Sequence, residues 1–323
     1  MSAPRILILA TGGTIAGTAG SATRRDYRPG QIGIESFVEQ AAALGIAAEL
    51  TGKQVANIGS EDIGPDIWCQ LHGAISAAMD DPAIDGVVIT HGTDTAEETA
   101  FLLDLTLPTA KPVVLVGAMR PADAVGSDGL RNFANAVRVA GDPDSGGRGV
   151  LLVMSDQVIA ARDARKARTI GTTAFTGFPR EAIANVTPSS LEWYLPPWRA
   201  GDSARYPFPA NFPFVPVLFA YAGMQPDAVT GLIEQGAKGI VLAGFGSGNA
   251  PEIVRQALAR SGVPVVRASR VDEGLVDREP EDDANGLVAA RALGPAKARI
   301  LLQVLVAAGI TDAAEIQRAF DTR

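Results

Sequence analysis

Two short turns of the sequence combine threonine hydroxyls with glycines, directly after apolar and β-branched runs. The first is TGGTIAG (11–17), which follows ILILA, and the second is HGTDT (91–95), which follows GVVIT. Glycine allows a tight backbone turn and the close approach of a ligand. A hydroxyl in such a turn is a candidate nucleophile, and open α/β sheets bind their ligands at the carboxyl ends of strands. The pair of turns therefore predicts nucleophilic chemistry at one edge of a sheet.

Thr14, in the first turn, has two rival interpretations. A phosphate-binding loop has the spacing GxGxxG or GxxxxGK[ST], and neither is present, nor is a lysine or an acidic ribose partner in the expected place. A tight strand exit whose threonines bond to their own backbone is the structural alternative. Nucleotide binding is therefore the weakest of the functional hypotheses for this turn.

The second turn places the hydroxyl of Thr93 beside the carboxylate of Asp94, and His91 begins the turn. In the structural alternative, Asp94 or Thr95 caps the following helix and His91 packs beside a strand end. The chain has two histidines, and His72 falls in an expected helix, so a Ser/His/Asp triad is poorly supported. Thr93 therefore needs another base.

Lys166 is the candidate base for Thr93. It lies in the basic stretch RDARKAR (162–168), which follows an apolar run. A lysine can accept a proton when burial and cationic neighbours lower its pKa. The alternative is an ordinary solvated basic loop.

Two further polar stretches are candidate binding groups. NIGSEDI (57–63) brings Ser60 and Glu61 after an expected strand at 54–57, although Ser60 also fits a helix cap. The acidic run EPEDD (279–283) is typical of a solvated loop, yet carboxylates also bind an α-ammonium group. His, Cys and Asp residues show no metal-ligand spacing, so the sequence predicts neither a metal nor a cofactor.

The elements that must position these turns are visible as apolar runs alternating with helix-like stretches. Such alternation predicts an α/β fold in which a mostly parallel sheet is flanked by helices. The expected strands are 5–10, 86–90, 112–116 and 149–154, and the expected helices are 34–44, 66–80, 96–105 and 130–140.

A proline-rich passage divides the chain. Residues 195–216 include six prolines, which neither a helix nor a central strand tolerates, so 196–216 is interpreted as a linker. We therefore expect an N-terminal catalytic α/β domain at 1–195 and a smaller C-terminal α/β domain at 217–323, with a site shared between domains or subunits. The expected C-terminal elements are strands 217–220, 239–243 and 263–268, helices 225–235 and 251–261, and a helical end.

Composition excludes some functions. The 323 residues carry a formal net charge of −8, and phosphate binding needs clustered Lys and Arg, so a nucleic-acid partner is not expected. Cys69 is the only cysteine, and no segment reaches the ~18–20 apolar residues of a membrane span. The N-terminal apolar stretch is shorter than a secretory signal requires. The expected compartment is the cytoplasm, or the periplasm if a leader has been removed.

Taken together, these motifs resemble the bacterial-type L-asparaginases, including the glutaminase-asparaginases. ILATGGTIAG and THGTDTAEETA are similar to that family's two signature patterns. The resemblance continues in order through VANIGSEDI, KPVVLVGAMRP, RDARKART, GFGSGNAP, VVRASR and PAKARILLQ. It covers nearly the whole chain.

The resemblance implies a role for each matching residue. Thr14 matches the nucleophile and Tyr27 the tyrosine that closes over it, while Thr93, Lys166 and Asp94 match a second, internal triad. Substrate-binding matches are Ser60 and Glu61 for the α-carboxylate and α-amino groups, Ala118 for a backbone contact to the side-chain amide, and Asn249 and Glu279 for groups lent to a neighbouring subunit. A shift of two residues would select Glu281 in place of Glu279. The family also implies a homotetramer.

Position 61 departs from the strictly asparagine-preferring members, which often have glutamine where this chain has Glu61. Glutaminase-competent members more often have glutamate, so glutamine hydrolysis is expected as well. The sequence thus predicts a cofactor-free amidohydrolase for L-asparagine and L-glutamine, acting through a threonine nucleophile. The rival of another class is a non-catalytic amino-acid sensor, which would need neither Lys166 nor Tyr27.

Overall fold

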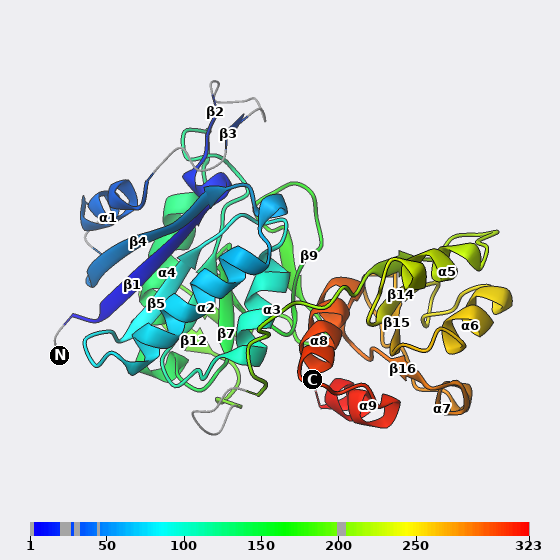
Figure 1. Cartoon of the computed structure of the whole chain (residues 1–323). Coiled ribbons are helices and arrows are strands. Elements are labelled where there is room, and N and C mark those ends of the chain that lie inside the picture. Colours follow the sequence, from blue (N-terminus) through cyan, green and yellow to red (C-terminus); the bar gives the residue numbers. More distant parts are fainter. Residues whose placement is uncertain (1–2, 20–26, 29–32, 44–45, 199–204, 323) are drawn as a thin grey trace. The chain divides into compact units, whose positions relative to one another are not determined.

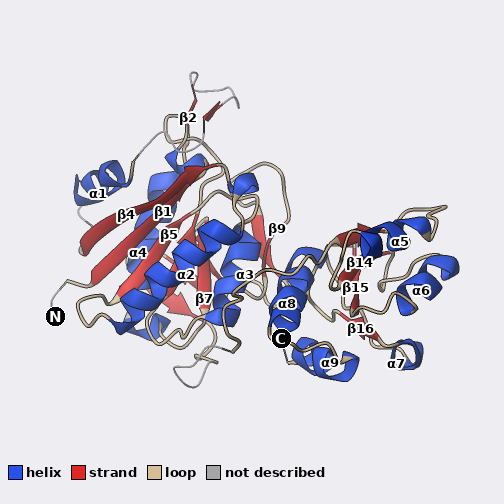
Figure 2. Ribbon diagram, viewed as in Figure 1, coloured by secondary structure: helices blue, strands red, loops and turns tan. Residues whose placement is uncertain are grey.

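The computed structural model describes residues 3–19, 27–28, 33–43, 46–198 and 205–322. The chain forms two compact units, Met1–Arg205 and Tyr206–Arg323, which are described separately. Figures 1 and 2 show the elements of each unit.

An eight-stranded sheet runs through the N-terminal unit. Its spatial order is β12 (Leu191–Trp193), β11 (Ala184–Val186), β8 (Gln157–Ala160), β7 (Val150–Met154), β6 (Val113–Val116), β5 (Gly86–Thr90), β1 (Arg5–Gly12) and β4 (Glu49–Ile58). The ladder β7-β6-β5-β1-β4 is parallel, whereas β8, β11 and β12 are added antiparallel. The mostly parallel sheet expected from the sequence is confirmed.

The strand order changes direction between β1 and β5. After β1, the next strand of the sheet along the chain is β4, on one side, and after β5 the chain continues outward on the other side to β6 and β7. At such a switch point the loops after adjacent strands diverge and leave room for a ligand. The two threonine turns follow β1 and β5, the strands on either side of this point.

Helices cover both faces of the sheet, as Figure 2 shows. α1 (Ile34–Ala43) and α4 (Gly129–Ala140) pack on one face, where Phe133 joins the cluster of Ile8 and Val88. α2 (Pro65–Asp80) and α3 (Ala96–Thr106) pack on the other, where Leu103 joins the cluster of Leu9 and Ile89. Because successive strand residues point to opposite faces, a strand buried on both sides must be apolar throughout.

Smaller elements complete the N-terminal unit. Two antiparallel pairs stand apart from the main sheet: β2 (Thr18–Ala19) with β3 (Tyr27–Arg28), and β9 (Ala164–Lys166) with β10 (Phe175–Gly177). Three 3-10 helices span Thr14–Ala16, Ser60–Asp62 and Pro143–Ser145. The described residues between Trp193 and Val217 form no helix or strand.

The C-terminal unit is a four-stranded parallel sheet with helices. Its strands, in spatial order, are β13 (Val217–Phe219), β14 (Ile240–Gly244), β15 (Val265–Ser269) and β16 (Leu287–Ala289). Its helices are α5 (Asp227–Glu234), α6 (Glu252–Ala259), α7 (Pro280–Asn285), α8 (Pro295–Ala307) and α9 (Ala313–Asp321). The solvated loop expected at 279–283 is wrong, because these residues begin α7 and Asp282 is buried.

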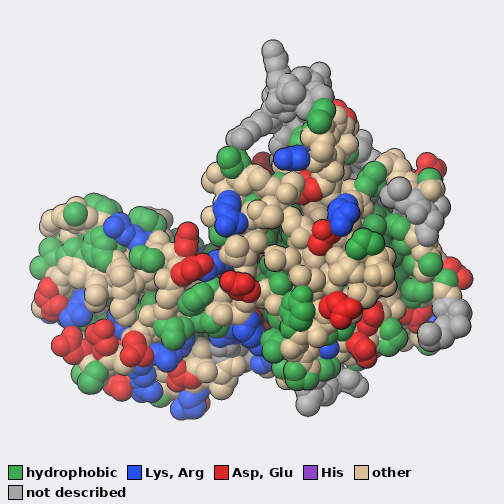
Figure 3. Space-filling model, turned by 180° about the vertical axis from the view of Figure 1, so that it is seen from behind, with side chains coloured by type: hydrophobic (Ala, Val, Ile, Leu, Met, Phe, Trp, Pro, Cys, Tyr) green, Lys and Arg blue, Asp and Glu red, His purple; other side chains and the backbone are tan. Residues whose placement is uncertain are grey.

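The surface carries side chains of both charges. On the face drawn in Figure 3, acidic and basic side chains are intermixed over both units. In the ranges that the structure describes, every helix is too short or too polar to cross a membrane.

Candidate active site

The first threonine turn leaves β1 and packs directly against the second. Gly13 has φ 79°, and a Cβ atom there would collide with the Cα of Gly92, so only glycine fits. The N–H of Gly13 donates to the carbonyl of Ile58 at 3.0 Å, which ties the ends of β1 and β4 together. Thr14 follows at the start of its 3-10 helix and is buried.

Thr93, Asp94 and Lys166 come together although 72 residues separate Asp94 from the lysine. Lys166 Nζ donates to Thr93 Oγ1 at 2.9 Å and forms an ion pair with the carboxylate of Asp94. The Lys166 side chain is 18% exposed and that of Asp94 is 58% exposed. A hydroxyl, an amine and a carboxylate therefore form a connected group whose carboxylate side is open to solvent.

Lys166 owes its position to a strand, not to a solvated loop. It is the last residue of β9 and lies opposite Phe175 of β10 in the antiparallel register. Phe175 is buried in the cluster under α3, the helix that follows the second turn. Packing of this hairpin against the main core thus brings the lysine to the end of β5.

Ser60 connects the end of β4 to the Thr93 turn. Its Oγ accepts the N–H of Asp94 at 3.0 Å, and its carbonyl accepts the hydroxyl of Thr95 at 2.7 Å. The alternative in which Ser60 caps a helix is wrong, since Gly59 is the N-cap of that 3-10 turn. Thr95 is the N-cap of α3, but its side chain binds Ser60 and does not cap the helix.

Glu61 is the exposed neighbour of buried Ser60. Its carboxylate folds back over the chain, because a Cβ at Gly59 would lie 2.5 Å from both of its oxygens. Gly59 therefore leaves the space that the Glu61 carboxylate occupies. The carboxylate thus lies against Gly59, which follows Ile58, the residue whose carbonyl accepts the N–H of Gly13.

Ala118 follows β6 and lies next to the Thr93 turn. A Cβ at the preceding residue, Gly117, would lie 2.9 Å from the carbonyl oxygen of His91 and 3.1 Å from Cγ2 of Thr93. Ala118 itself is fully buried. The loop after β6 thus forms another wall of the same site.

Sequence reasoning missed two side chains that hold this loop. Asp128 and Asn132, from α4, bind the backbone of residues 117–120. A local signal existed, because an aspartate directly before a helix is a common N-cap. No local signal shows that its carboxylate turns to another loop.

His91 is a structural member of the second turn. It is fully buried, and burial lowers its pKa to about 4. Trp68 Nε1 donates to Thr99 Oγ1 at 2.9 Å, and that hydroxyl lies 3.0 Å from His91 Nε2. His91 Nδ1 lies 2.6 Å from the carbonyl of Gly92, so a neutral ring donates from Nδ1 and accepts at Nε2. This agrees with the packed histidine of the structural alternative.

Two sequence-predicted residues of the N-terminal half remain. The backbone of Tyr27 pairs with Ala19 in the β2–β3 pair, while its side chain lies outside the described part of the chain. His72 is half-buried on α2, with Nε2 3.1 Å from the carbonyl of Thr106. His72 therefore lies in the expected helix, at the edge of the core.

Asn249 and its turn belong to the C-terminal unit. Asn249 is exposed, and its backbone forms a bridge with Phe245 through bonds of 2.7 and 2.8 Å. The guanidinium of Arg267, which is 1% exposed, donates to the carbonyl of Ser247 at 2.9 Å within this turn. It also binds the buried carboxylate of Asp282 at 2.5 Å. A buried cation thus fixes the turn that carries Asn249.

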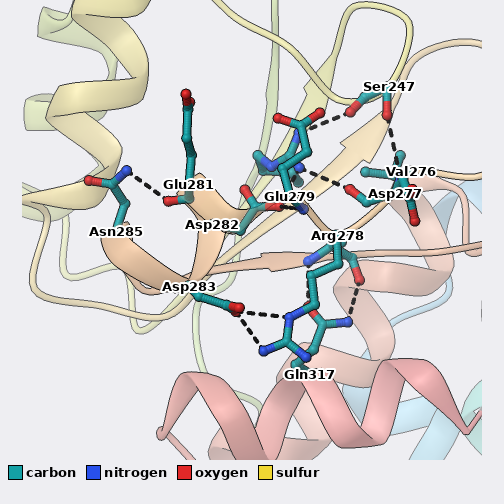
Figure 4. A network of polar contacts seen from close by, with 12 residues as sticks. Ser247, Val276, Asp277, Arg278, Glu279, Glu281, Asp282, Asp283, Asn285 and Gln317 are labelled. Atoms are coloured by element: carbon teal, nitrogen blue, oxygen red, sulfur yellow. Dashed lines mark hydrogen bonds and ion pairs between the residues drawn. The ribbon is translucent and has the colours of Figure 1, made fainter.

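Glu279 and Glu281, both labelled in Figure 4, have different surroundings. Glu279 is the N-cap of α7, and its carboxylate accepts the N–H of Asp282, whose own carboxylate accepts the N–H of Glu279 at 2.9 Å. Glu281 is exposed and pairs with Arg255 of α6 at 3.0 Å. Glu279 is therefore held by the capping box, whereas Glu281 is part of a surface ion pair.

The N-terminal group contains what acyl transfer requires. It brings together hydroxyls, a lysine and carboxylates on connected loops, and these are the kinds of group that nucleophilic acyl transfer uses. Among the residues that the structure describes, no cluster of three His, Cys, Asp or Glu side chains could hold a metal ion.

Comparison with family models covers both units. Residues 5–199 match the model described as Asparaginase, N-terminal, and residues 214–320 match the Glutaminase/Asparaginase C-terminal domain. The candidate residues from Thr14 to Lys166 fall in the first match, and Asn249 and Glu279 fall in the second.

Similar proteins extend over the same length. The chain is 41% identical to L-asparaginase 2 of Escherichia coli (strain K12), covering 99% of this chain and 94% of that protein. It is 38% identical to the glutaminase-asparaginase of Pseudomonas fluorescens biotype A, covering 98% and 89%. A crystal structure of a probable cytoplasmic L-asparaginase from Campylobacter jejuni superposes with a TM-score of 0.94 at 34% identity, covering 99% of this chain and 100% of that one.

Proposed function

This chain belongs to the asparaginase family and is an L-asparaginase, and from that premise we propose that it also hydrolyses L-glutamine and that Thr14 is its nucleophile. In this proposal Thr93, Lys166 and Asp94 form the proton relay. The observation that carries it is the contact of Lys166 Nζ with both Thr93 Oγ1 and the Asp94 carboxylate. The turn that holds Thr93 and Asp94 packs against the turn that holds Thr14.

The reaction proceeds in two halves. Thr14 Oγ attacks the side-chain carbonyl carbon, and its proton passes through Thr93 to Lys166, which enters the step as the neutral amine and becomes the ammonium that Asp94 holds in place. The carbon–nitrogen bond breaks, and the nitrogen leaves as ammonia with the returned proton. Water then attacks the aspartyl ester, the Oγ–carbon bond breaks, and Thr14 regains its proton as aspartate leaves. The sum is one amide and one water converted to one acid and ammonia.

Charge develops on the carbonyl oxygen during attack and needs hydrogen-bond donors. Backbone N–H groups of the two glycine-rich turns are the natural donors. Those of Gly13 and Asp94 already bind Ile58 and Ser60, so they hold the turns together. We assign the oxyanion to other N–H groups of the same turns.

Substrate recognition uses the loops around this centre. We assign the Ser60 hydroxyl to the α-carboxylate and the Glu61 carboxylate to the α-ammonium group, since opposite charges pair and hydroxyls donate to carboxylates. The carbonyl of Ala118 accepts an N–H of the side-chain amide. Support comes from the position of all three residues on loops that contact the Thr93 turn.

The second unit completes the site in a neighbouring subunit of a homotetramer. Asn249 is exposed on its turn, and Glu279 is held by a capping box, so both are presented by fixed backbone. Analytical ultracentrifugation would test this assembly, and a monomer with full activity would contradict it.

We assign the enzyme to the cytoplasm. The solved Campylobacter jejuni relative is described as cytoplasmic, and Cys69, the only cysteine, is exposed. Cell fractionation tests this, with recovery in the periplasmic fraction as the contradicting result.

The function is tested by ammonia release from L-asparagine and L-glutamine, measured side by side without added metal or nucleotide. Wild type should release ammonia from both, and Thr14→Ala should lose turnover by about a thousandfold or more. Thr11→Ser, in the same turn, is the matched control and should retain activity. Near wild-type ammonia release by Thr14→Ala would show that the nucleophile is misassigned, and calorimetric aspartate binding without any ammonia would favour the sensor.

A further inference from the structure

Asp128 directly precedes α4 as its N-cap residue, yet its carboxylate does not cap that helix. An aspartate at this position usually accepts an N–H of the first helical turn. Here no such bond forms, and the carboxylate accepts the backbone N–H groups of Met119 at 3.1 Å and Arg120 at 3.0 Å. Asp128 is 8% exposed, so this buried charge is directed to the loop after β6.

Asn132, one turn later on α4, completes the support of that loop. Its Nδ2 donates to the carbonyl of Gly117 at 3.1 Å and to the carboxylate of Asp128 at 3.0 Å. Its Oδ1 accepts the N–H of Ser155 at 3.1 Å, and its side chain is 1% exposed. Both polar ends of this asparagine are therefore satisfied by fixed partners.

The same network reaches the hairpin that carries Lys166. Ser155 lies in the turn between β7 and β8, and its hydroxyl donates to the carbonyl of Thr172. Thr172 lies in the segment that joins β9 to β10. Asn132 thus connects the Ala118 loop to the support of the lysine.

We propose that Asp128 and Asn132 are positioning residues that fix the Ala118 carbonyl for the side-chain N–H of the substrate, and so set the preference for an amide over an ester. The proposal rests on the function proposed above, through the assignment of Ala118. Asp128 binds the N–H groups of residues 119 and 120, and Asn132 binds the carbonyl of residue 117. Together these bonds hold both peptides that flank Ala118. The β-methyl ester of L-aspartate has no side-chain N–H, so its hydrolysis does not use that carbonyl.

The experiment compares L-asparagine with β-methyl L-aspartate, because both give L-aspartate as product. Asn132→Ala and Asp128→Asn are assayed with wild type, and kcat and KM are measured for each substrate. In Asp128→Asn, an amide group that donates replaces an oxygen that now accepts the backbone N–H groups. Each variant should lose about tenfold or more in kcat/KM for the amide and less than about threefold for the ester.

The matched control is Asn135→Ala on the same helix. Asn135 Nδ2 donates to Asp156, in the turn between β7 and β8, at 2.7 Å, so the amide-to-ester ratio of the variant should equal that of wild type. Because both substrates are assayed on one preparation, partial unfolding lowers both rates and leaves their ratio unchanged.

An unchanged amide-to-ester ratio in Asn132→Ala and Asp128→Asn, whether both rates fall together or neither falls, would overturn the proposal. If wild type forms aspartate from neither substrate, the proposed function itself fails. The two failures are thereby distinguished.

Discussion

The two units of the chain each contain a cation–carboxylate pair, and the pairs differ in what surrounds them. Lys166 and Asp94 share a contact with the hydroxyl of Thr93, and the carboxylate is 58% exposed. Arg267 and Asp282 are 1% and 4% exposed, and both also bind backbone groups of the C-terminal unit. An ion pair that contacts a hydroxyl and has a solvent-exposed carboxylate can interact with a substrate. A buried ion pair whose remaining bonds go to backbone groups holds loops in place.

Lys166→Met should have the largest effect of the variants considered, and the quantity that it lowers is kcat. In the proposed relay the amine of Lys166 is the base, so its loss should lower kcat for ammonia release about a thousandfold or more. Asp94 stays solvated, so the free energy of unfolding in urea should change by less than about 1 kcal/mol.

Arg168→Met is the matched control for this change, because Arg168 is an exposed cation two residues away. It should keep the wild-type kcat. More than a tenth of wild-type turnover in Lys166→Met would remove the distinction between the two pairs.

Arg267→Met should act on stability. It leaves the Asp282 carboxylate buried without its cation, which costs about 3–5 kcal/mol in the free energy of unfolding. Arg255→Ala, which breaks the exposed pair with Glu281, should cost less than about 1 kcal/mol in the same urea titration.

A double variant, Arg267→Met with Asp282→Leu, tests the cause. Removing both charges should recover part of the loss, because no unpaired buried charge remains. Equal costs for Arg267→Met and Arg255→Ala would contradict the structural role of the buried pair.

His91 lies in the same turn as Thr93 and Asp94, yet it is fully buried, as the Arg267–Asp282 pair nearly is. Its pKa falls from 6.5 to about 4 in the folded chain. Between these values the unfolded chain binds the proton and the native chain does not, so stability falls as the pH is lowered from 6.5 to 4. At pH 5 the loss relative to pH 7.5 should be about 2 kcal/mol.

Urea unfolding of wild type and His91→Gln at the two pH values measures this effect. The variant should lose most of the pH dependence over this range. His72→Gln should retain most of it, because His72 is only half-buried. An unchanged slope in His91→Gln would show that His91 titrates normally in the folded protein.

Glu61→Gln should give the smallest effect, on substrate choice alone. The ratio of kcat/KM for L-glutamine to that for L-asparagine should fall by about three- to tenfold, because the resemblance associates glutamate here with glutamine hydrolysis. Glu35→Gln, an exposed glutamate in the first turn of α1, is the control and should leave the ratio unchanged. A rise in the ratio would contradict the role of Glu61.

The sequence predicted the parallel core well, because its strands are buried on both faces and must be continuous apolar runs. β5 is the clearest case, with the same bounds in sequence and structure. The antiparallel strands β8, β11 and β12 were missed, since three or four residues carry too little periodicity. α7 was missed because its buried acidic residue, Asp282, is paired with Arg267, a contact that the local sequence does not show.

The site was predictable where motif and strand end coincide, as at Thr14, Thr93 and Ser60. Lys166 could be named from its motif, but its contact with Thr93 depends on a hairpin whose packing the sequence does not show. Asp128 and Asn132 could not be found, because their partners lie in a loop that α4 meets only in three dimensions.

The identity of the nucleophile is the central claim. It is tested most directly by acid-quenching wild-type enzyme during turnover of L-asparagine and locating the aspartyl ester by peptide mass spectrometry. We predict the ester on the peptide that contains Thr14. An ester on the peptide that contains Thr93 would contradict the account, because Thr93 would then be the nucleophile and not part of the relay.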